Sequence, residues 1–168
     1  VVNDKKFQKM LISRPIMPLG KDIGYLPGSK EEKIEHWMNP IYDNLEYILS
    51  YKTPDIKVKI YQLFKDGKIE LEALTYIRGR SIPNQFVIID EAQNLTPHEI
   101  KTIISRVGHG TKMVLTGDPY QIDNPYLDAS SNGLTYAAER LKDQPLHGHV
   151  TLTKSERSPL ASIAAEFL

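Results

Sequence analysis

A run of four apolar residues that leads directly into two carboxylates constrains the fold of this chain most strongly. Residues 86–89 read Phe-Val-Ile-Ile, and Asp90 and Glu91 follow at once. A short β-branched run bounded by polar residues predicts a strand buried on both faces, as in a parallel sheet. Because open α/β sheets bind their ligands at the carboxyl ends of the strands, we expect both carboxylates to face a ligand crevice.

Adjacent aspartate and glutamate in that position suit two chemical tasks. Asp90 could hold a Mg²⁺ ion, through water, beside a nucleotide phosphate. Glu91 could orient or deprotonate an attacking water molecule. A strand that ends in a solvated acidic turn would show the same residues, so this stretch alone leaves a catalytic pair and a surface turn open.

A second stretch repeats the plan and favours a shared site. Residues 112–115 predict another buried strand, and the sequence Thr-Gly-Asp-Pro-Tyr-Gln follows it at residues 116–121. Two buried strands that carry polar residues at the same end predict one crevice lined by both.

Composition limits the class of protein. A length of 168 residues predicts one domain, and 40% hydrophobic and 25% charged residues are ordinary for a globular protein. Basic and acidic residues number 21 each, so a nucleic-acid surface would have to be local. The absence of cysteine excludes disulfides, thiolate zinc sites and cysteine nucleophiles. No apolar run approaches the roughly twenty residues that span a bilayer, and no signal-peptide plan is present, so we expect a cytoplasmic protein without a membrane partner.

The rest of the chain predicts strands that alternate with helices. We expect a buried strand at residues 9–13, a strand with one wet face at 69–72 and a last strand at 149–153. Residues 73–77 could continue the second of these or form a turn. Thr96 and Glu99 predict a capping box for a helix that runs to about Arg106. Further helices are expected at residues 31–38, 40–51, 57–65, 134–141 and 159–167.

Basic residues near the predicted strand ends are candidates for phosphate contacts. Arg14 ends the first strand and could meet the phosphate of a nucleotide or a nucleic acid, or lie in a surface salt bridge. Arg78 and Arg80 flank a glycine ahead of the acidic strand, where bidentate pairing with phosphate and a solvated turn are both open. Lys21 lies in a long Gly- and Pro-rich loop, and long loops in compact domains are often functional.

Two of these motifs resemble a known family. Asp90-Glu-Ala-Gln-Asn94 and Leu115-Thr-Gly-Asp-Pro-Tyr-Gln121 are similar to the Walker B and third motifs of superfamily-one helicases and, more closely, of the PhoH-like ATPases. The remaining motifs that stand in the order of that family are Ser13-Arg-Pro15, Gly24-Tyr-Leu-Pro-Gly28 with Glu32-Lys33, Arg78-Gly-Arg80 and Glu156-Arg-Ser158. The resemblance therefore covers nearly the whole chain.

The resemblance implies an α/β fold of the P-loop NTPase type, RecA-like or superfamily-one-helicase-like, with helices that flank a parallel sheet. It implies ATP and Mg²⁺ as cofactors and, for the complete protein, an RNA-directed ATPase or helicase. The family also resembles hexameric rings, which implies a homo-oligomer. Residues 19–28 look most like a bacterial branch in which a PIN ribonuclease domain precedes the ATPase.

Roles carry over from the family at matching positions. Asp90 would hold Mg²⁺ and Glu91 would activate water. Gln121 would sense the γ-phosphate and link it to nucleic acid, while Arg157 would reach the γ-phosphate. The resemblance also implies that Arg78 lies near the nucleotide or RNA.

RNA contacts are expected from a few local residues, because the net charge is zero. This set comprises Arg14, Lys21 and Arg80, with Arg78 as a residue that could serve either ligand.

One departure from the family is large. None of the ten glycines stands in the phosphate-loop pattern G-x-x-x-x-G-K-[ST]. The chain therefore looks like the PhoH-like ATPase domain, residues 1–168, without its amino-terminal strand and phosphate loop, and we expect it to be inactive by itself. The alternative is a non-catalytic fragment that binds RNA or serves oligomer assembly.

Overall fold

The structure is a computed structural model that describes residues 6–15, 39–50, 55–77 and 79–153, together with residues 158, 160 and 163. Its contacts divide the chain into two compact units, Val1–Ala137 and Ala138–Leu168, and each is described by itself. The helix expected at 31–38 and most of the one at 159–167 lie outside the described residues, and so do Lys21, Arg78 and Arg157.

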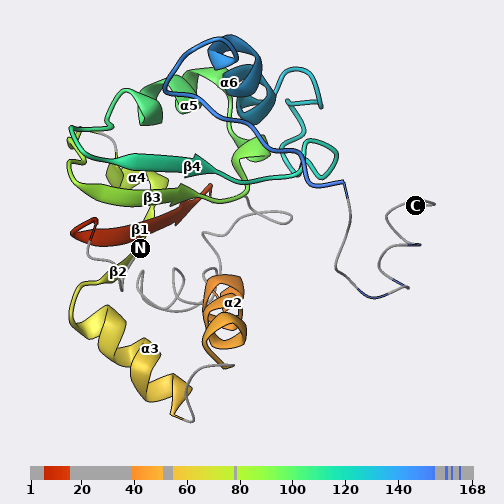
Figure 1. Cartoon of the computed structure of the whole chain (residues 1–168). Coiled ribbons are helices and arrows are strands. Elements are labelled where there is room, and N and C mark those ends of the chain that lie inside the picture. The colour runs from red at the N-terminus through yellow and green to blue at the C-terminus, as the bar shows by residue number, and fades with distance from the viewer. Residues whose placement is uncertain are drawn as a thin grey trace. The chain divides into compact units, whose positions relative to one another are not determined.

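The first unit is built on a parallel sheet, as the sequence predicts (Figure 1). Its strands are β1 (Lys9–Arg14), β2 (Ile69–Ala73), β3 (Gln85–Ile89) and β4 (Lys112–Leu115), in the spatial order β2-β1-β3-β4. Every pair is parallel, so all carboxyl ends of the strands lie at one edge of the sheet. This α/β architecture is the one expected of a P-loop NTPase-like domain, and that prediction is confirmed.

The helices are α2 (Asn39–Ser50), α3 (Ile56–Lys65), the short α4 (Leu74–Ile77), α5 (Pro97–Ile104) and α6 (Gly133–Leu141), with a 3-10 turn, η2, at Ala92–Asn94. Their termini follow from local chemistry. Thr96 and Glu99 exchange hydrogen bonds in the predicted capping box at the start of α5. Gly67, with φ of 63°, follows α3 in the left-handed conformation that ends many helices.

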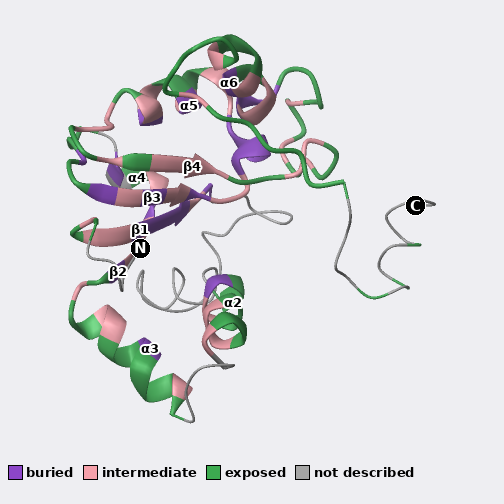
Figure 2. Ribbon diagram, viewed as in Figure 1, coloured by how far each residue is buried: buried purple, intermediate pink, exposed green. Residues whose placement is uncertain are grey.

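One face of the sheet packs against α5. Strand side chains alternate between faces, and Leu11 on β1 lies beside Val87 on β3 in the parallel register. Both belong to a buried cluster that also includes Ile89 and the α5 residues Ile100 and Ile103. Figure 2 shows the buried residues along β1 and β3. These two central strands therefore form the rigid base from which the adjoining loops begin.

The opposite face packs against α2 and α3. Ile12 of β1 belongs to a second cluster with Ile41 of α2, and Ile88 of β3 packs against that cluster. Phe64 of α3 joins it and meets the Tyr42 ring at a centroid distance of 5.1 Å. Helices on both faces make β1 and β3 apolar on both sides, which is why their sequences read as nearly continuous hydrophobic runs.

Four expectations differ in detail from the structure. Residues 74–77 form α4 rather than a strand extension or a turn. β4 is not fully buried, because it is an edge strand of the described sheet and its first residue, Lys112, is exposed. Residues 149–153 alternate in polarity but form no strand, since no described strand pairs with them and Val150 is 80% exposed. β3 is more buried than β4, yet two of its five side chains are only half-buried.

Candidate functional site

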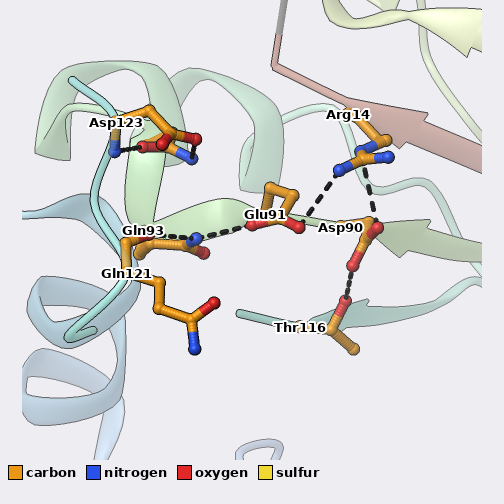
Figure 3. A network of polar contacts seen from close by, with 8 residues as sticks. Arg14, Asp90, Glu91, Gln93, Thr116, Gln121 and Asp123 are labelled. Atoms are coloured by element: carbon orange, nitrogen blue, oxygen red, sulfur yellow. Dashed lines mark hydrogen bonds and ion pairs between the residues drawn. The ribbon is translucent and has the colours of Figure 1, made fainter. Parts of the chain in front are cut away.

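The carboxyl ends of three strands bring polar residues together (Figure 3). The register pairs Ser13 with Ile89, so the next residues along each strand, Arg14 and Asp90, lie side by side. The Asp90 N–H donates to the Ser13 carbonyl at 2.8 Å and the Thr116 N–H to the Ile89 carbonyl at 2.9 Å. Backbone pairing between strands therefore fixes where each of these side chains begins.

Arg14 lies between the two carboxylates. Its Nε is 3.5 Å from Asp90 Oδ2, and its Nη2 donates to Glu91 Oε1 at 3.1 Å. The Arg14 side chain is only 15% exposed, against 29% and 38% for the Asp90 and Glu91 side chains. One guanidinium thus partly neutralises two half-buried carboxylates. Hydrogen bonds between ionised groups of this kind are stronger than those between neutral groups.

Asp90 has a second partner on β4's carboxyl side. The Thr116 hydroxyl donates to Asp90 Oδ1 at 2.8 Å, so each carboxylate oxygen of Asp90 has one neighbour. The Ala92 N–H donates to the Thr116 carbonyl at 2.9 Å, which ties the loop after β3 to the loop after β4. These hydrogen bonds hold the Asp90 carboxylate between the carboxyl ends of β3 and β4.

Glu91 adopts an unusual backbone. Its φ of 54° and ψ of 38° place it in the left-handed region, where residues other than glycine are uncommon. Such strain persists only where surrounding contacts hold it, and it gathers at functional sites. The left-handed conformation of Glu91 turns the chain sharply between β3 and η2. The Glu91 carboxylate then lies beside Arg14.

Gln93 holds the other oxygen of that carboxylate. Its Nε2 donates to Glu91 Oε2 at 2.6 Å and to the Gln121 backbone carbonyl at 2.8 Å. The Gln93 side chain is fully buried, and its Oε1 lies against Gly117, where a Cβ would collide with it. Glycine at 117 thus lets the loop after β4 approach the buried amide closely.

A second amide anchors the same loop further along. Asn94 Oδ1 accepts from the backbone N–H groups of Asp123 and Asn124, at 2.7 and 3.3 Å. The Asn94 Nδ2 lies 3.4 Å from Asp123 Oδ2. Two residues of η2, Gln93 and Asn94, therefore hold the loop after β4 at two points.

The sequence-predicted residues do not all meet. The structure brings Arg14, Asp90 and Glu91 together. The backbone of Gln121 reaches Gln93, but its side chain is exposed and donates to Asp118 Oδ2 at 2.9 Å, away from Glu91 (Figure 3).

Arg80 belongs to a different contact. Its Nη1 donates to both carboxylate oxygens of Glu72 on β2, at 2.9 and 3.1 Å, and its side chain is 54% exposed. No hydrogen bond or ion pair between described residues joins Arg80 to Asp90 or Glu91. Arg78, Arg157 and Lys21 lie outside the described residues, so their places stay predictions.

Sequence reasoning missed Gln93 and Thr116 as members of the site. Both stand inside quoted motifs, but their roles depend on contacts across strands. Two adjacent amides, Gln93 and Asn94, follow the strand and its pair of carboxylates with only Ala92 between them, and this was the available signal of a buried polar turn.

The donor set fits a Mg²⁺ ion held with a nucleotide. Mg²⁺ prefers oxygen ligands and is usually bound by one or two carboxylates plus phosphates and water, without a dedicated protein cage. Asp90 would supply the carboxylate, and Glu91 and the Thr116 hydroxyl lie near it. Within the described ranges, no group of three or more His, Cys, Asp or Glu residues could hold a metal by itself.

None of the helices among the described residues is long and apolar enough to cross a membrane.

Comparisons with known proteins place the chain in a family. The family model for PhoH-like protein matches residues 1–166. Protein PhoH2 of Bacillus subtilis is 60% identical over 162 residues, which cover 96% of this chain and 36% of that protein. Protein PhoH2 of Mycolicibacterium smegmatis is 40% identical over 169 residues, which cover 100% of this chain and 37% of that protein. The PhoH-like protein of Synechocystis sp. is 42% identical over 136 residues, covering 80% of this chain and 39% of that protein.

The chain therefore spans little more than a third of the length of these relatives. The parallel sheet, the order of its motifs and a family match over 166 of its 168 residues agree with one another. On this evidence the chain belongs to the PhoH family.

Proposed function

We propose that this chain is the ATP-binding and ATP-hydrolysing core of a PhoH-family protein, which in its complete form is an RNA-directed ATPase or helicase. The observation that carries the proposal is the cluster of Arg14, Asp90 and Glu91 at the carboxyl edge of a parallel sheet. That edge is where open α/β sheets bind nucleotides.

Asp90 and Glu91 have different tasks in this proposal. Asp90 would hold the Mg²⁺ that accompanies ATP, and the bound ion would supply positive charge to the phosphates. Glu91 orients a water molecule and accepts its proton as the water attacks the γ-phosphate. The separation of tasks is supported by the partners of each carboxylate: the Thr116 hydroxyl holds Asp90, whereas the buried Gln93 amide holds Glu91.

In this scheme Arg14 has a different partner in the nucleotide-free and the nucleotide-bound protein. With no nucleotide its guanidinium neutralises the acidic pair, and its position at the end of β1 also suits contact with phosphate. Arg157 contacts the γ-phosphate, and Arg78 lies beside the nucleotide or RNA. Gln121 senses the γ-phosphate and links it to the RNA site. For Gln121 this requires its side chain to leave Asp118, to which it is bonded here.

The remaining parts of the proposal concern the whole protein. No phosphate-loop pattern occurs in the 168 residues, and the proposal assigns the cradle for the β-phosphate to the complete protein. The isolated chain should then bind Mg-ATP about 10²–10⁴-fold more weakly, since the loss of two hydrogen bonds to charge, at about 1.5–3 kcal/mol each, costs about 3–6 kcal/mol. RNA contacts come from Arg14, Lys21 and Arg80. The protein works in the cytoplasm as a homo-oligomer, a hexameric ring.

Two substitutions in the full-length protein test the function. Asp90→Asn should weaken Mg²⁺-dependent ATP binding, because the metal loses a carboxylate. Glu91→Gln should leave binding intact and slow hydrolysis by about 10²–10⁴-fold, the usual contribution of positioned acid–base help. Glu139→Gln, which changes an exposed carboxylate of α6, is the matched control.

Equal phosphate release by Glu91→Gln and wild type would remove the role given to Glu91. No hydrolysis by the full-length wild type, with or without RNA, would favour the non-catalytic alternative.

A further inference from the structure

Gln93 makes a pair of contacts that the proposed reaction has not yet used. It is the one residue in the described part of the site whose side chain joins the Glu91 carboxylate to the loop after β4. One nitrogen, Nε2, donates to both partners, at 2.6 Å to Glu91 Oε2 and at 2.8 Å to the Gln121 carbonyl. A side-chain amide has two N–H groups, so both bonds can form at once.

The orientation of that amide is determined. Both partners of Nε2 are pure acceptors, so the opposite orientation of the amide would place its oxygen against two oxygens. The Gln93 side chain is fully buried, so water does not reach its amide, whereas the Glu91 carboxylate is 38% exposed. On the other side Oε1 lies against Gly117, whose missing Cβ leaves only enough room for the oxygen.

The loop partner is part of a small, exposed turn. Asp118 accepts from the Tyr120 N–H at 2.9 Å and from Gln121 Nε2 at 2.9 Å, and its carbonyl accepts from the Gln121 N–H at 3.1 Å. Tyr120 is 88% exposed. These hydrogen bonds connect Asp118, Tyr120 and Gln121 to one another, so a displacement of the turn would carry with it the Gln121 carbonyl that accepts from the Gln93 amide.

We propose that Gln93 is a positioning residue that fixes the Glu91 carboxylate for the reaction and ties its position to the exposed turn at residues 118–121. The inference rests on the proposed function, because it takes Glu91 as the residue that activates water. Because the Gln93 side chain is fully buried, the proposal gives it no direct contact with substrate or metal. A ligand that shifts the turn, such as RNA in the complete protein, changes the hydrogen bond that Glu91 receives.

The first test is Gln93→Met in the full-length protein. Methionine has a similar size and is tolerated in buried sites, but it donates no hydrogen bond. Turnover should fall about 10- to 100-fold, the usual effect of removing a residue that orients a reacting group. Affinity for a non-hydrolysable ATP analogue should stay at the wild-type value, because Asp90 and its partners are unchanged.

A double-mutant cycle with Glu91→Gln separates positioning from a general structural effect. If Gln93 acts through Glu91, adding Gln93→Met to Glu91→Gln causes no further loss of turnover. If Gln93 only supports the fold, the two losses multiply and nucleotide affinity falls along with turnover.

Gly117→Ala is a second variant, in which residue 93 remains glutamine. The new Cβ collides with Oε1 and also lies close to Leu134 Cδ2 and the Ala92 backbone nitrogen, at 3.1 and 3.2 Å, so the Gln93 amide has to move from its position. Its turnover should therefore fall as in Gln93→Met. Gly148→Ala is the matched control, because a Cβ there meets no atom within 4 Å.

The outcomes distinguish this inference from the function on which it rests. If the wild type hydrolyses ATP and either Gln93→Met or Gly117→Ala matches its turnover, the positioning role is overturned. Additive losses in the double-mutant cycle, or equal losses in affinity and turnover, overturn it too. A wild type that hydrolyses no ATP overturns the proposed function instead.

Discussion

Replacing Arg14 with glutamine should weaken the fold and strengthen Mg²⁺ binding at the acidic pair. Glutamine stays polar but removes the positive charge that lies 3.5 Å from Asp90 Oδ2 and 3.1 Å from Glu91 Oε1. The two carboxylates follow each other in the chain, so without their shared cation they repel. Both effects come from the same lost charge but act on different equilibria.

The size of the stability loss follows from burial. Exposed ion pairs contribute about 0–1 kcal/mol, whereas breaking a buried pair costs about 3–5 kcal/mol. The Arg14 side chain is 15% exposed, but its partners are 29% and 38% exposed and so are partly screened by water. We therefore expect a loss of about 2 kcal/mol, between the two limits, in the free energy of unfolding measured with urea.

The metal equilibrium should shift in the other direction. Without nucleotide, Mg²⁺ and the Arg14 guanidinium compete for the same carboxylates. Even in bulk water two unit charges about 4 Å apart interact by about 1 kcal/mol, and Mg²⁺ carries two charges. Removing the guanidinium should tighten Mg²⁺ binding roughly tenfold, since about 1.4 kcal/mol corresponds to that factor.

Isothermal titration with MgCl₂ without nucleotide measures the shift. Lys112→Gln is the control, because it removes a positive charge from the amino end of β4, remote in the sheet from the carboxyl edge. Unchanged stability together with unchanged or weaker Mg²⁺ binding would refute the view that Arg14 neutralises the pair in the nucleotide-free protein.

Three further predictions can be checked separately. Arg157→Ala should lower ATP turnover by up to ~10³–10⁵-fold while ADP affinity is kept, as expected of an arginine on the γ-phosphate; equal loss of ADP and ATP-analogue affinity would count against it. Single-strand RNA affinity should fall with salt, with a logarithmic slope of about 0.7 per phosphate neutralised, and Arg80→Gln should reduce that slope; binding that ignores salt would exclude this basic set. The Ser130 hydroxyl, with the backbone N–H groups of Ser130 and Ser131, lowers the pKa of Asp128 to about 2 from 3.8, so this carboxylate's contribution to stability is complete above pH 3.8 and is lost as the pH falls through about 2. An NMR titration should show the pKa of Asp128 rise in Ser130→Ala, and an unchanged pKa would contradict the assignment.

Much of the fold could be predicted because its signals are local. β3 and β1 have apolar runs that only a sheet covered on both faces explains, and helices cover both faces here. Thr96 and Glu99 satisfy each other within four residues, so the start of α5 needs no knowledge of the rest of the chain.

The failures share a physical cause: each depends on a partner elsewhere in the chain. Residues 149–153 have the alternation of a strand, but a strand also needs a neighbour to receive its hydrogen bonds, and polarity does not supply one. Gln93 could not be placed from its sequence position, because its acceptors lie at residues 91 and 121. The contact between Arg80 and Glu72 could not be predicted from sequence spacing either, and the contact of Arg80 with RNA stays a prediction.

A crystal structure of the full-length protein with Mg²⁺ and a non-hydrolysable ATP analogue tests the central claim most directly. The account predicts the phosphates at the carboxyl ends of β1, β3 and β4, the metal at the Asp90 carboxylate directly or through water, and a water molecule between Glu91 and the γ-phosphate. An analogue bound elsewhere, with Asp90 and Glu91 still paired to Arg14, would contradict it.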